Sequence, residues 1–291
     1  MFQFLDELCV LKISKLNKAV RYMLISAFAF SLMQVCVKLL TGFPVTELIL
    51  FRSIVSLVLS LGVVFRAKIS PFGNAKKYLI LRGVFGVIAL SMFFYTLQKL
   101  PIATAITIQY LSPIFTSLFA IWILKEPMKT RQWLFFAISF SGILVMKGLN
   151  NDIKLSYLLI GVLAAGFAGL AYNMIRKVKD TDHPVVVVLY FPLIAIPVMT
   201  VFSLYNWKTP VGNEWLILLA MGIFTQIAQV FMTKAWQMES ANKVASLKYV
   251  GIVFALFFDF SLFNIIPPWT TIAGILLVLL GVFLNVRFKG K

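Results

Sequence analysis

The sequence predicts an all-α integral membrane protein whose ten transmembrane helices form a 5+5 inverted-topology repeat. Three observations predict this fold: an apolar composition, ten stretches long enough to cross a bilayer, and an internal repeat in which each copy has an odd number of spans. Of 291 residues, 61% are hydrophobic and 13% are charged, about half the charged share of a soluble domain. This composition excludes a disordered chain and argues strongly against a water-soluble enzyme.

Ten stretches each provide the roughly 20 mostly apolar residues that a helix needs to cross a bilayer core. They cover 21–40, 46–65, 79–98, 103–123, 132–149, 156–175, 185–205, 214–234, 242–262 and 269–288. In order, they begin beside Arg21, Pro44, Lys77, Pro101, Arg131, Lys154, Pro184, Gly212, Lys243 and Pro268. The seventh stretch contains Pro192 and Pro197 and is the least regular.

The charges give these spans an orientation. The chain has 27 Lys and Arg residues against 10 Asp and Glu residues. With the N-terminus inside, 19 basic residues fall in cytoplasmic segments and five in outer segments, and the other three lie within spans. The positive-inside rule therefore predicts a multi-pass protein of the inner (plasma) membrane with both termini cytoplasmic. Cytoplasmic loops explain the basic excess better than a nucleic-acid partner does.

The remaining composition limits the chemistry. Two cysteines and one histidine provide neither a disulfide framework nor a metal cluster. The sequence contains no catalytic constellation, no phosphate-binding glycine loop and no room for an ATP-binding domain. We therefore predict no catalytic residues, no metal and no cofactor, and expect a protein that is not an enzyme. Residues 1–18 are interpreted as a cytoplasmic segment, followed by repeats at 19–149 and 150–291.

The two halves of the chain align with each other. A shift of 139 residues places Tyr110 on Tyr249 and Gly142 on Gly281, and a shift of 135 places Tyr22 on Tyr157. Because each half has five spans, the second copy enters the membrane from the opposite side. Inverted repeats of this kind build alternating access around a site near the bilayer midplane. The sequence thus indicates a secondary transporter.

The run RGVFGVIALSMFFYTLQKLPIATAITIQYLSPIFTSLFAIWILKEP, the later GILVMKG and the second-span ELILFRS resemble the EamA-type repeat of the drug/metabolite transporter superfamily. The resemblance covers nearly the whole chain. It implies a central cavity lined by spans 1, 3, 4, 6, 8 and 9, and a small organic solute as substrate. One departure is that the acid which closes the fourth span, Glu126, has Ile265 as its counterpart in the second repeat.

Lys248 is the first candidate for substrate binding. It lies inside the ninth span, where a cation facing lipid costs on the order of 3 kcal/mol or more. It either binds an anionic group of the solute or snorkels to the inner headgroups. Gln109 aligns with Lys248 as Tyr110 aligns with Tyr249, so these four residues are predicted to line the cavity or to join helices by hydrogen bonds.

Other polar residues within the spans extend the candidate site. The predicted solute partners are Gln34, Tyr95, Tyr172, Asn173, Gln226 and Gln229. Gln226 and Gln229 share one helix face. Pro113 and Gly251 occupy nearly matching places in spans 4 and 9 and are predicted gating hinges, with a tolerated packing kink as the alternative.

Three charged residues within spans have other interpretations. Arg52 is expected to pair with Glu47 or with outer headgroups. Arg82 binds inner-leaflet lipid or lines the inner vestibule. Asp259 is a weaker candidate for proton coupling, because it lies near the outer end of its span.

The sequence as a whole predicts a secondary transporter or exchanger for a small organic, anionic or zwitterionic solute, acting as a monomer or homodimer among membrane lipids. A proton-coupled exporter of amino acids or drugs is the alternative within transport. An integral membrane enzyme or a channel is the more distant alternative, and the lone His183 provides no set of catalytic groups.

Overall fold

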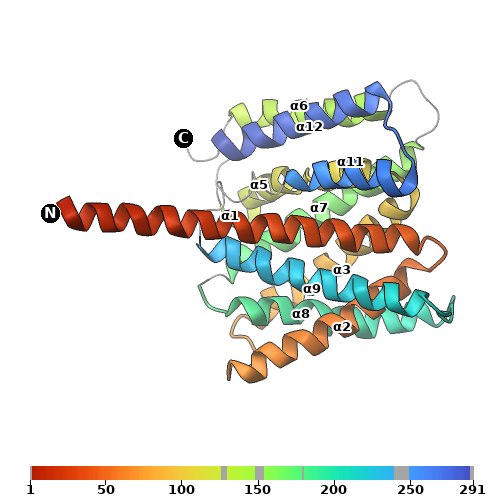
Figure 1. The fold of residues 1–291 in the computed structure, drawn as a ribbon, viewed down its shortest axis with the longest axis horizontal. Helices are drawn as coiled ribbons and strands as arrows, with labels where there is room; N and C mark the ends of the chain where they lie inside the picture. The colour runs from red at the N-terminus through yellow and green to blue at the C-terminus, as the bar shows by residue number, and fades with distance from the viewer. Residues whose placement is uncertain (1, 126–129, 148–153, 179, 239–248, 289–291) are drawn as a thin grey trace.

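The computed structural model describes residues 2–125, 130–147, 154–178, 180–238 and 249–288. The described chain is a bundle of helices that run side by side, with no strand in these ranges (Figure 1). The helices, labelled as in Figure 1, are α1 Phe2–Leu39, α2 Val45–Arg66, α3 Lys76–Lys99, α4 Ile102–Gln109, α5 Ser112–Ile123, α6 Thr130–Lys147, α7 Leu155–Lys177, α8 Pro184–Ser203, α9 Glu214–Met238, α11 Val250–Phe263 and α12 Trp269–Phe288.

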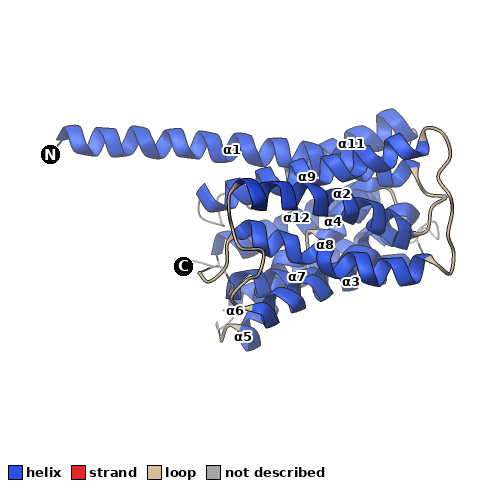
Figure 2. Cartoon of the chain, turned by 90° about the horizontal axis from the view of Figure 1, so that it is seen from below, coloured by secondary structure: helices blue, strands red, loops and turns tan. Residues whose placement is uncertain are grey.

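Length and apolar composition identify the spans within this bundle. Seven segments of the described chain are long and apolar enough to cross a membrane, and one of them joins α4 and α5 into a single span. Two shorter apolar segments lie in α11 and α12. The structure confirms the predicted all-helical membrane fold. α1 extends well beyond the bundle (Figure 2), so one helix contains both the first span and nearly all of the predicted N-terminal segment.

The seventh span is more regular than its sequence indicates. α8 is one continuous helix that contains both Pro192 and Pro197. Proline within a helix removes one backbone donor. A membrane helix tolerates this loss where neighbouring groups satisfy the freed carbonyl.

The helices pair as an inverted repeat requires. α1 packs on α9 and α3 packs on α7, while α2 packs on α8 and α6 packs on α12. Exchanging the two halves converts the α1–α9 pair into the α7–α3 pair, and it leaves the other two pairs unchanged. Each half therefore buries its helices against the other half, and neither forms a layer of its own.

Two acidic side chains show the same symmetry at opposite ends of the bundle. Glu47 accepts a hydrogen bond from the backbone N–H of Lys208, at 2.6 Å. Asp182, which is 135 residues later, accepts from the backbone N–H groups of Asn74 and Ala75, at 2.5 and 3.2 Å. Glu47 thus holds the loop after the seventh span to the start of the second span. Asp182 holds the loop after the second span to the start of the seventh span.

Small residues bring α7 close to its neighbours. A Cβ atom on Gly161 would lie 3.0 Å from Cγ2 of Ile108. A Cβ atom on Gly169 would lie 2.8–2.9 Å from Phe115 and from the backbone nitrogen of Thr116. Gly166, on the same helix, has nothing within 4 Å of the equivalent position. Small residues of this kind allow close helix packing in membranes.

We expect Gly169→Ala to lower the free energy of unfolding by about 2–3 kcal/mol, because the new methyl group meets backbone atoms that cannot rotate away. Gly166→Ala is the matched control and should change stability by no more than about 1 kcal/mol. Thermal unfolding of both variants in the same detergent measures the difference. Equal stability of the two variants would show that α5 and α7 do not pack this closely.

Candidate functional site

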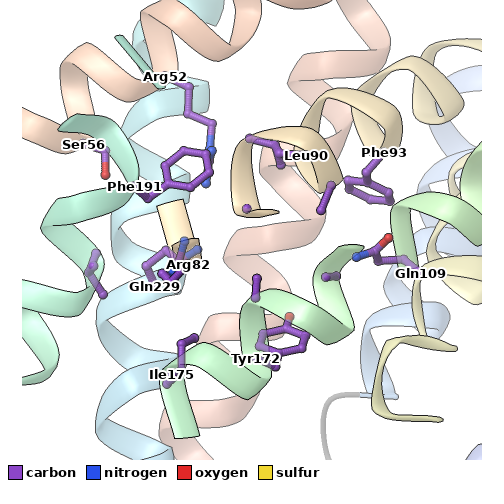
Figure 3. Close-up of a pocket in the computed structure, with 15 residues that line it drawn as sticks. Arg52, Ser56, Arg82, Leu90, Phe93, Gln109, Tyr172, Ile175, Phe191 and Gln229 are labelled. Carbon is purple, nitrogen blue, oxygen red and sulfur yellow. The ribbon is translucent and has the colours of Figure 1, made fainter. Parts of the chain in front are cut away.

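A cavity of about 130 Å³ lies between the two halves of the chain (Figure 3). Its walls are supplied by α2, α3 and α4 from the first half and by α7, α8 and α9 from the second. Its described lining residues are Arg52, Ser56, Arg82, Gly86, Ala89, Leu90, Phe93, Gln109, Ala168, Ala171, Tyr172, Ile175, Val188, Phe191 and Gln229. Polar and apolar groups from both halves thus face one partly open space.

The cavity differs from the expected one in two of its walls. The resemblance implied walls from spans 1 and 9, but no described residue of α1 or α11 lines the cavity. The second and seventh spans, α2 and α8, take part instead. The physical reason lies in the packing: α1 is in contact with α9, α11 and α3, and it buries its polar side chains there.

Arg52 lines the cavity from α2 and is held by contacts from other helices. Its side chain is 5% exposed, and its Nε donates to Oγ1 of Thr225 at 3.1 Å. Its guanidinium carbon lies 5.1 Å from the ring centroid of Phe191 and 6.0 Å from that of Phe94. Its Nη1 is buried without a hydrogen-bond partner. The expected pair between Arg52 and Glu47 does not form.

Arg82 contacts the same ring from α3. Its guanidinium carbon lies 5.5 Å from the centroid of Phe191, and its Nε is buried without a partner. A Cβ atom on Gly86 would lie 2.8 Å from Nη1 of Arg82. The glycine, one turn further along α3, therefore provides the space in which the guanidinium group lies. Figure 3 shows both arginines beside Phe191, with Gln109 across from them.

The two arginines start from opposite ends of the bundle. Arg52 is seven residues into α2 and Arg82 six residues into α3, or roughly 9–11 Å from the start of each helix. These helices are successive spans, so their starts lie at opposite membrane faces. Because both guanidinium groups contact Phe191, their charges lie within about 11 Å of each other. At an effective dielectric constant of about 20, two such charges repel by at least about 1.5 kcal/mol.

No carboxylate of the described residues lies within 4.0 Å of either guanidinium group. The ion pair found in these parts of the chain joins Lys208 to Glu214, at 3.2 Å and away from the cavity. The described residues also contain no group of three or more His, Cys, Asp or Glu side chains suited to a metal ion. The arrangement provides hydrogen-bond donors and positive charge, which are the means of binding an anion.

Three of the sequence-predicted site residues line this cavity. They are Gln109 from α4, Tyr172 from α7 and Gln229 from α9. Oε1 of Gln109 is buried without a hydrogen-bond partner, so its amide is available to a ligand. The i, i+3 spacing of Gln226 and Gln229 does not place both residues in the cavity, since only Gln229 reaches it.

Four other predicted site residues lie outside the cavity. Gln226 accepts from Oγ of Ser56 at 2.8 Å, which joins α9 to α2. Asn173 donates to the carbonyl of Thr116 at 3.0 Å, which joins α7 to α5. Tyr95 packs edge-on against Tyr157. Gln34 lies buried in α1, where its Oε1 has no hydrogen-bond partner.

The predicted tyrosine pair meets at the junction between the halves. The rings of Tyr110 and Tyr249 are 5.2 Å apart and nearly perpendicular. A Cβ atom on Gly251 would lie 2.6 Å from the hydroxyl oxygen of Tyr110, so the glycine makes room for that hydroxyl. Neither tyrosine lines the cavity. Lys248, which precedes Tyr249, lies outside the described residues.

The fourth span is interrupted beside this pair. α4 ends at Gln109 and α5 begins at Ser112. Pro113 has no N–H, so it cannot donate to the carbonyl of Gln109 one turn earlier. The interruption places the end of α4, which carries Gln109, at the cavity wall. The helix is thus interrupted at Tyr110 and Leu111, just before Pro113, and the gating role of Pro113 stays a prediction.

Asp259 binds backbone groups instead of facing the cavity. Its two carboxylate oxygens accept from the N–H groups of Ile102 and Ala103, at 2.9 and 2.8 Å. These N–H groups open α4 and have no partner within that helix. Nearby, Nζ of Lys38 donates to the carbonyl of Leu100 at 2.7 Å. This arrangement fixes the start of the fourth span.

Sequence reasoning left both arginines out of the candidate substrate site: it expected Arg52 to pair with Glu47 or with outer headgroups, and it left open whether Arg82 binds inner-leaflet lipid or lines the inner vestibule. Each is a cation within a span, and such residues face a cavity or a partner by default. The proximity of Glu47 to Arg52 in the sequence suggested an ion pair. The fold instead directs Glu47 to the backbone of Lys208, which only tertiary structure reveals.

Comparison with known proteins places the chain among transporters. The model of the EamA-like transporter family matches residues 17–147 and 155–287. The pseudopaline exporter CntI of Pseudomonas aeruginosa is 30% identical over 94% of this chain and 98% of its own length. Human solute carrier family 35 member G1 is 31% identical over 88% of this chain and 75% of its own.

Similarity at lower sequence identity extends to two further proteins. A riboflavin transporter of Vibrio cholerae is 24% identical over 86% of this chain and 85% of its own length. A crystal structure with 18% sequence identity superposes with a TM-score of 0.63, covering 94% of this chain and 99% of that one. At this identity the superposition supports the fold alone.

Proposed function

The chain belongs to the EamA-like transporter family, and we propose that it is a secondary transporter that moves a small organic solute across the membrane by alternating access. The observation that carries this proposal is the cavity between the two halves. Because each half supplies three of the lining helices, a tilt of one half against the other opens the space to one side and closes it to the other.

The relatives support a small organic solute without fixing its direction of movement. One is named as an exporter of pseudopaline and another as an uptake transporter for S-adenosylmethionine. In the proposed arrangement the protein lies in the inner membrane with both termini cytoplasmic, and residues 19–149 and 150–291 are the two moving units. The 19-to-5 distribution of basic residues supports this orientation.

Exchange or facilitated movement accounts for the geometry better than proton coupling does. The alternative, a proton-coupled exporter, needs a titratable group in the solute path. Asp259 was the candidate, and its carboxylate is bound to two backbone N–H groups away from the cavity. No carboxylate of the described residues lines the cavity.

Counterflow in proteoliposomes tests the proposal. Purified protein is reconstituted with an excess of one unlabelled solute inside, and entry of the same labelled solute is followed without any ion gradient. The panel contains riboflavin, S-adenosylmethionine, amino acids and small dicarboxylates. We expect at least one solute to accumulate at least tenfold above protein-free liposomes.

Two variants of α7 link this movement to the cavity. Ala168→Phe fills the cavity wall and should abolish accumulation, whereas Leu163→Phe, on an exposed position of the same helix, should leave it unchanged. Absence of counterflow for the whole panel, or accumulation that requires a proton gradient, would contradict the proposal.

A further inference from the structure

We propose that Arg52 and Arg82 together form an anion-binding site in the wall of the cavity, so that the transported solute presents a carboxylate or phosphate group to them. This inference rests on the proposed function and names its substrate class. It differs from the expectation based on Lys248, because it arises from two described side chains that the sequence places in different spans.

The first step is that both arginines are prepared for a ligand. Nη1 of Arg52 and Nε of Arg82 are buried donors without partners. Arg52 makes one hydrogen bond, from Nε to Thr225. This bond leaves the two terminal nitrogen atoms of the guanidinium group, Nη1 and Nη2, for a ligand. Guanidinium groups offer five N–H donors in a planar fork that matches carboxylate and phosphate oxygens.

The second step concerns the aromatic ring between the two cations. Phe191 lies 5.1 and 5.5 Å from the two guanidinium carbons. A ring over a guanidinium plane stabilises the charge and leaves the N–H groups at its edge free. The ring therefore supports both cations without occupying the donors that an anion needs.

The third step is a contrast with the other buried charges. Glu47, Asp182 and Asp259 accept hydrogen bonds from backbone N–H groups, and the half-buried Lys38 donates to a backbone carbonyl. The two arginines have neither a described carboxylate nor a backbone carbonyl as partner. Two neighbouring cations in a mostly apolar surrounding require a counter-charge. An anionic solute supplies that charge, and it reduces the repulsion between the arginines as it binds.

The position of the pair suits a transported anion. One arginine extends from the start of α2 and the other from the start of α3, at opposite membrane faces. An anion that enters from either face therefore meets one of the two cations first and the second near the midplane. The cavity of about 130 Å³ is comparable to cavities that admit a benzene-sized molecule. A small carboxylate or a phosphate group fits this space.

Binding to the purified protein tests the inference. Thermal unfolding in a neutral detergent is followed against the concentration of succinate or of inorganic phosphate, with neutral succinamide as the comparison and with ionic strength held constant. We expect at least one of the two anions, and not succinamide, to raise the unfolding temperature in a saturable way. Arg52→Gln and Arg82→Gln should each weaken its apparent affinity tenfold or more, and the double variant should abolish binding.

Two further variants separate binding from folding. Arg66→Gln removes an exposed arginine at the end of α2 and should leave the affinity unchanged. Gly86→Ala keeps both charges but displaces Nη1 of Arg82, so it should weaken anion binding three- to tenfold. This variant remains informative if a glutamine variant fails to fold.

Several outcomes overturn the inference: neither anion stabilises the protein more than succinamide, or the stabilisation persists in the double variant. A third is that added phosphatidylglycerol, and not the soluble anions, gives the arginine-dependent effect, which would identify a lipid site. Counterflow of a neutral solute that is normal in both arginine variants would overturn the inference and leave the transport proposal intact. Arginine-dependent anion binding without counterflow of any solute would support the anion-binding site and contradict the transport proposal.

Discussion

Asp259→Ala is expected to lower the free energy of unfolding by about 3–5 kcal/mol, which is the usual cost of removing one partner of a buried charged interaction. The change leaves the N–H groups of Ile102 and Ala103 without an acceptor at the buried start of α4. It also removes the negative charge that interacts with Lys38. Chemical or thermal unfolding in detergent measures the loss.

Asp259→Asn provides the control for this prediction. The amide retains one acceptor oxygen and the size of the side chain, so about 1–2 kcal/mol should be lost. Counterflow per folded molecule should remain unchanged, because the side chain holds a helix and does not face the cavity. A variant that is as stable as the wild type but loses a proton dependence of transport would show instead that Asp259 couples protons.

The second large effect is expected for Tyr110→Ala, with a loss of about 3–5 kcal/mol for truncating a large buried aromatic side chain. Tyr110 is 7% exposed and packs edge-on against Tyr249 where α4 meets α11. The same unfolding measurement applies. A loss below about 1 kcal/mol, typical of exposed positions, would mean that the tyrosine pair does not join the halves.

A double-mutant cycle tests the contact itself. Gly251→Ala places a methyl group 2.6 Å from the hydroxyl oxygen of Tyr110 and should cost about 1–3 kcal/mol. Tyr110→Phe removes that oxygen and creates the space. The double variant should therefore be more stable than the sum of the single changes indicates, by at least about 0.5 kcal/mol. Additive effects would place the two residues apart.

Most of the fold could be predicted from the sequence because membrane spans obey a simple length rule. Roughly 20 apolar residues are needed per crossing, and the described helices follow the predicted stretches closely. An interruption of the fourth span near Pro113 was also predictable, since proline lacks the donor that helix geometry requires. The extent of α1 was not, because charged residues interrupt residues 1–18 before an apolar run of span length is reached.

The site was less predictable because a polar residue in a span has two possible roles. Gln109 and Asn173 look equivalent in sequence, yet Gln109 lines the cavity and Asn173 bonds α5. Whether such a residue lines the cavity or bonds another helix depends on how its helix is rotated relative to its neighbours. Arg52 shows the same ambiguity: its acidic neighbour in the sequence binds elsewhere, and its own partner, Thr225, lies in α9.

The bond between Arg52 and Thr225 has a consequence for synthesis. The two residues are 173 positions apart, so at 5–20 residues per second the ribosome needs roughly 10–35 s to make the second after the first. During that interval Arg52 has entered the bilayer with α2, but the helix that supplies Thr225 does not yet exist. Phe191, which covers the guanidinium group, is also still missing. The newly made first half therefore offers Arg52 the ring of Phe94, and the contacts with Thr225 and Phe191 form only after the second half is made.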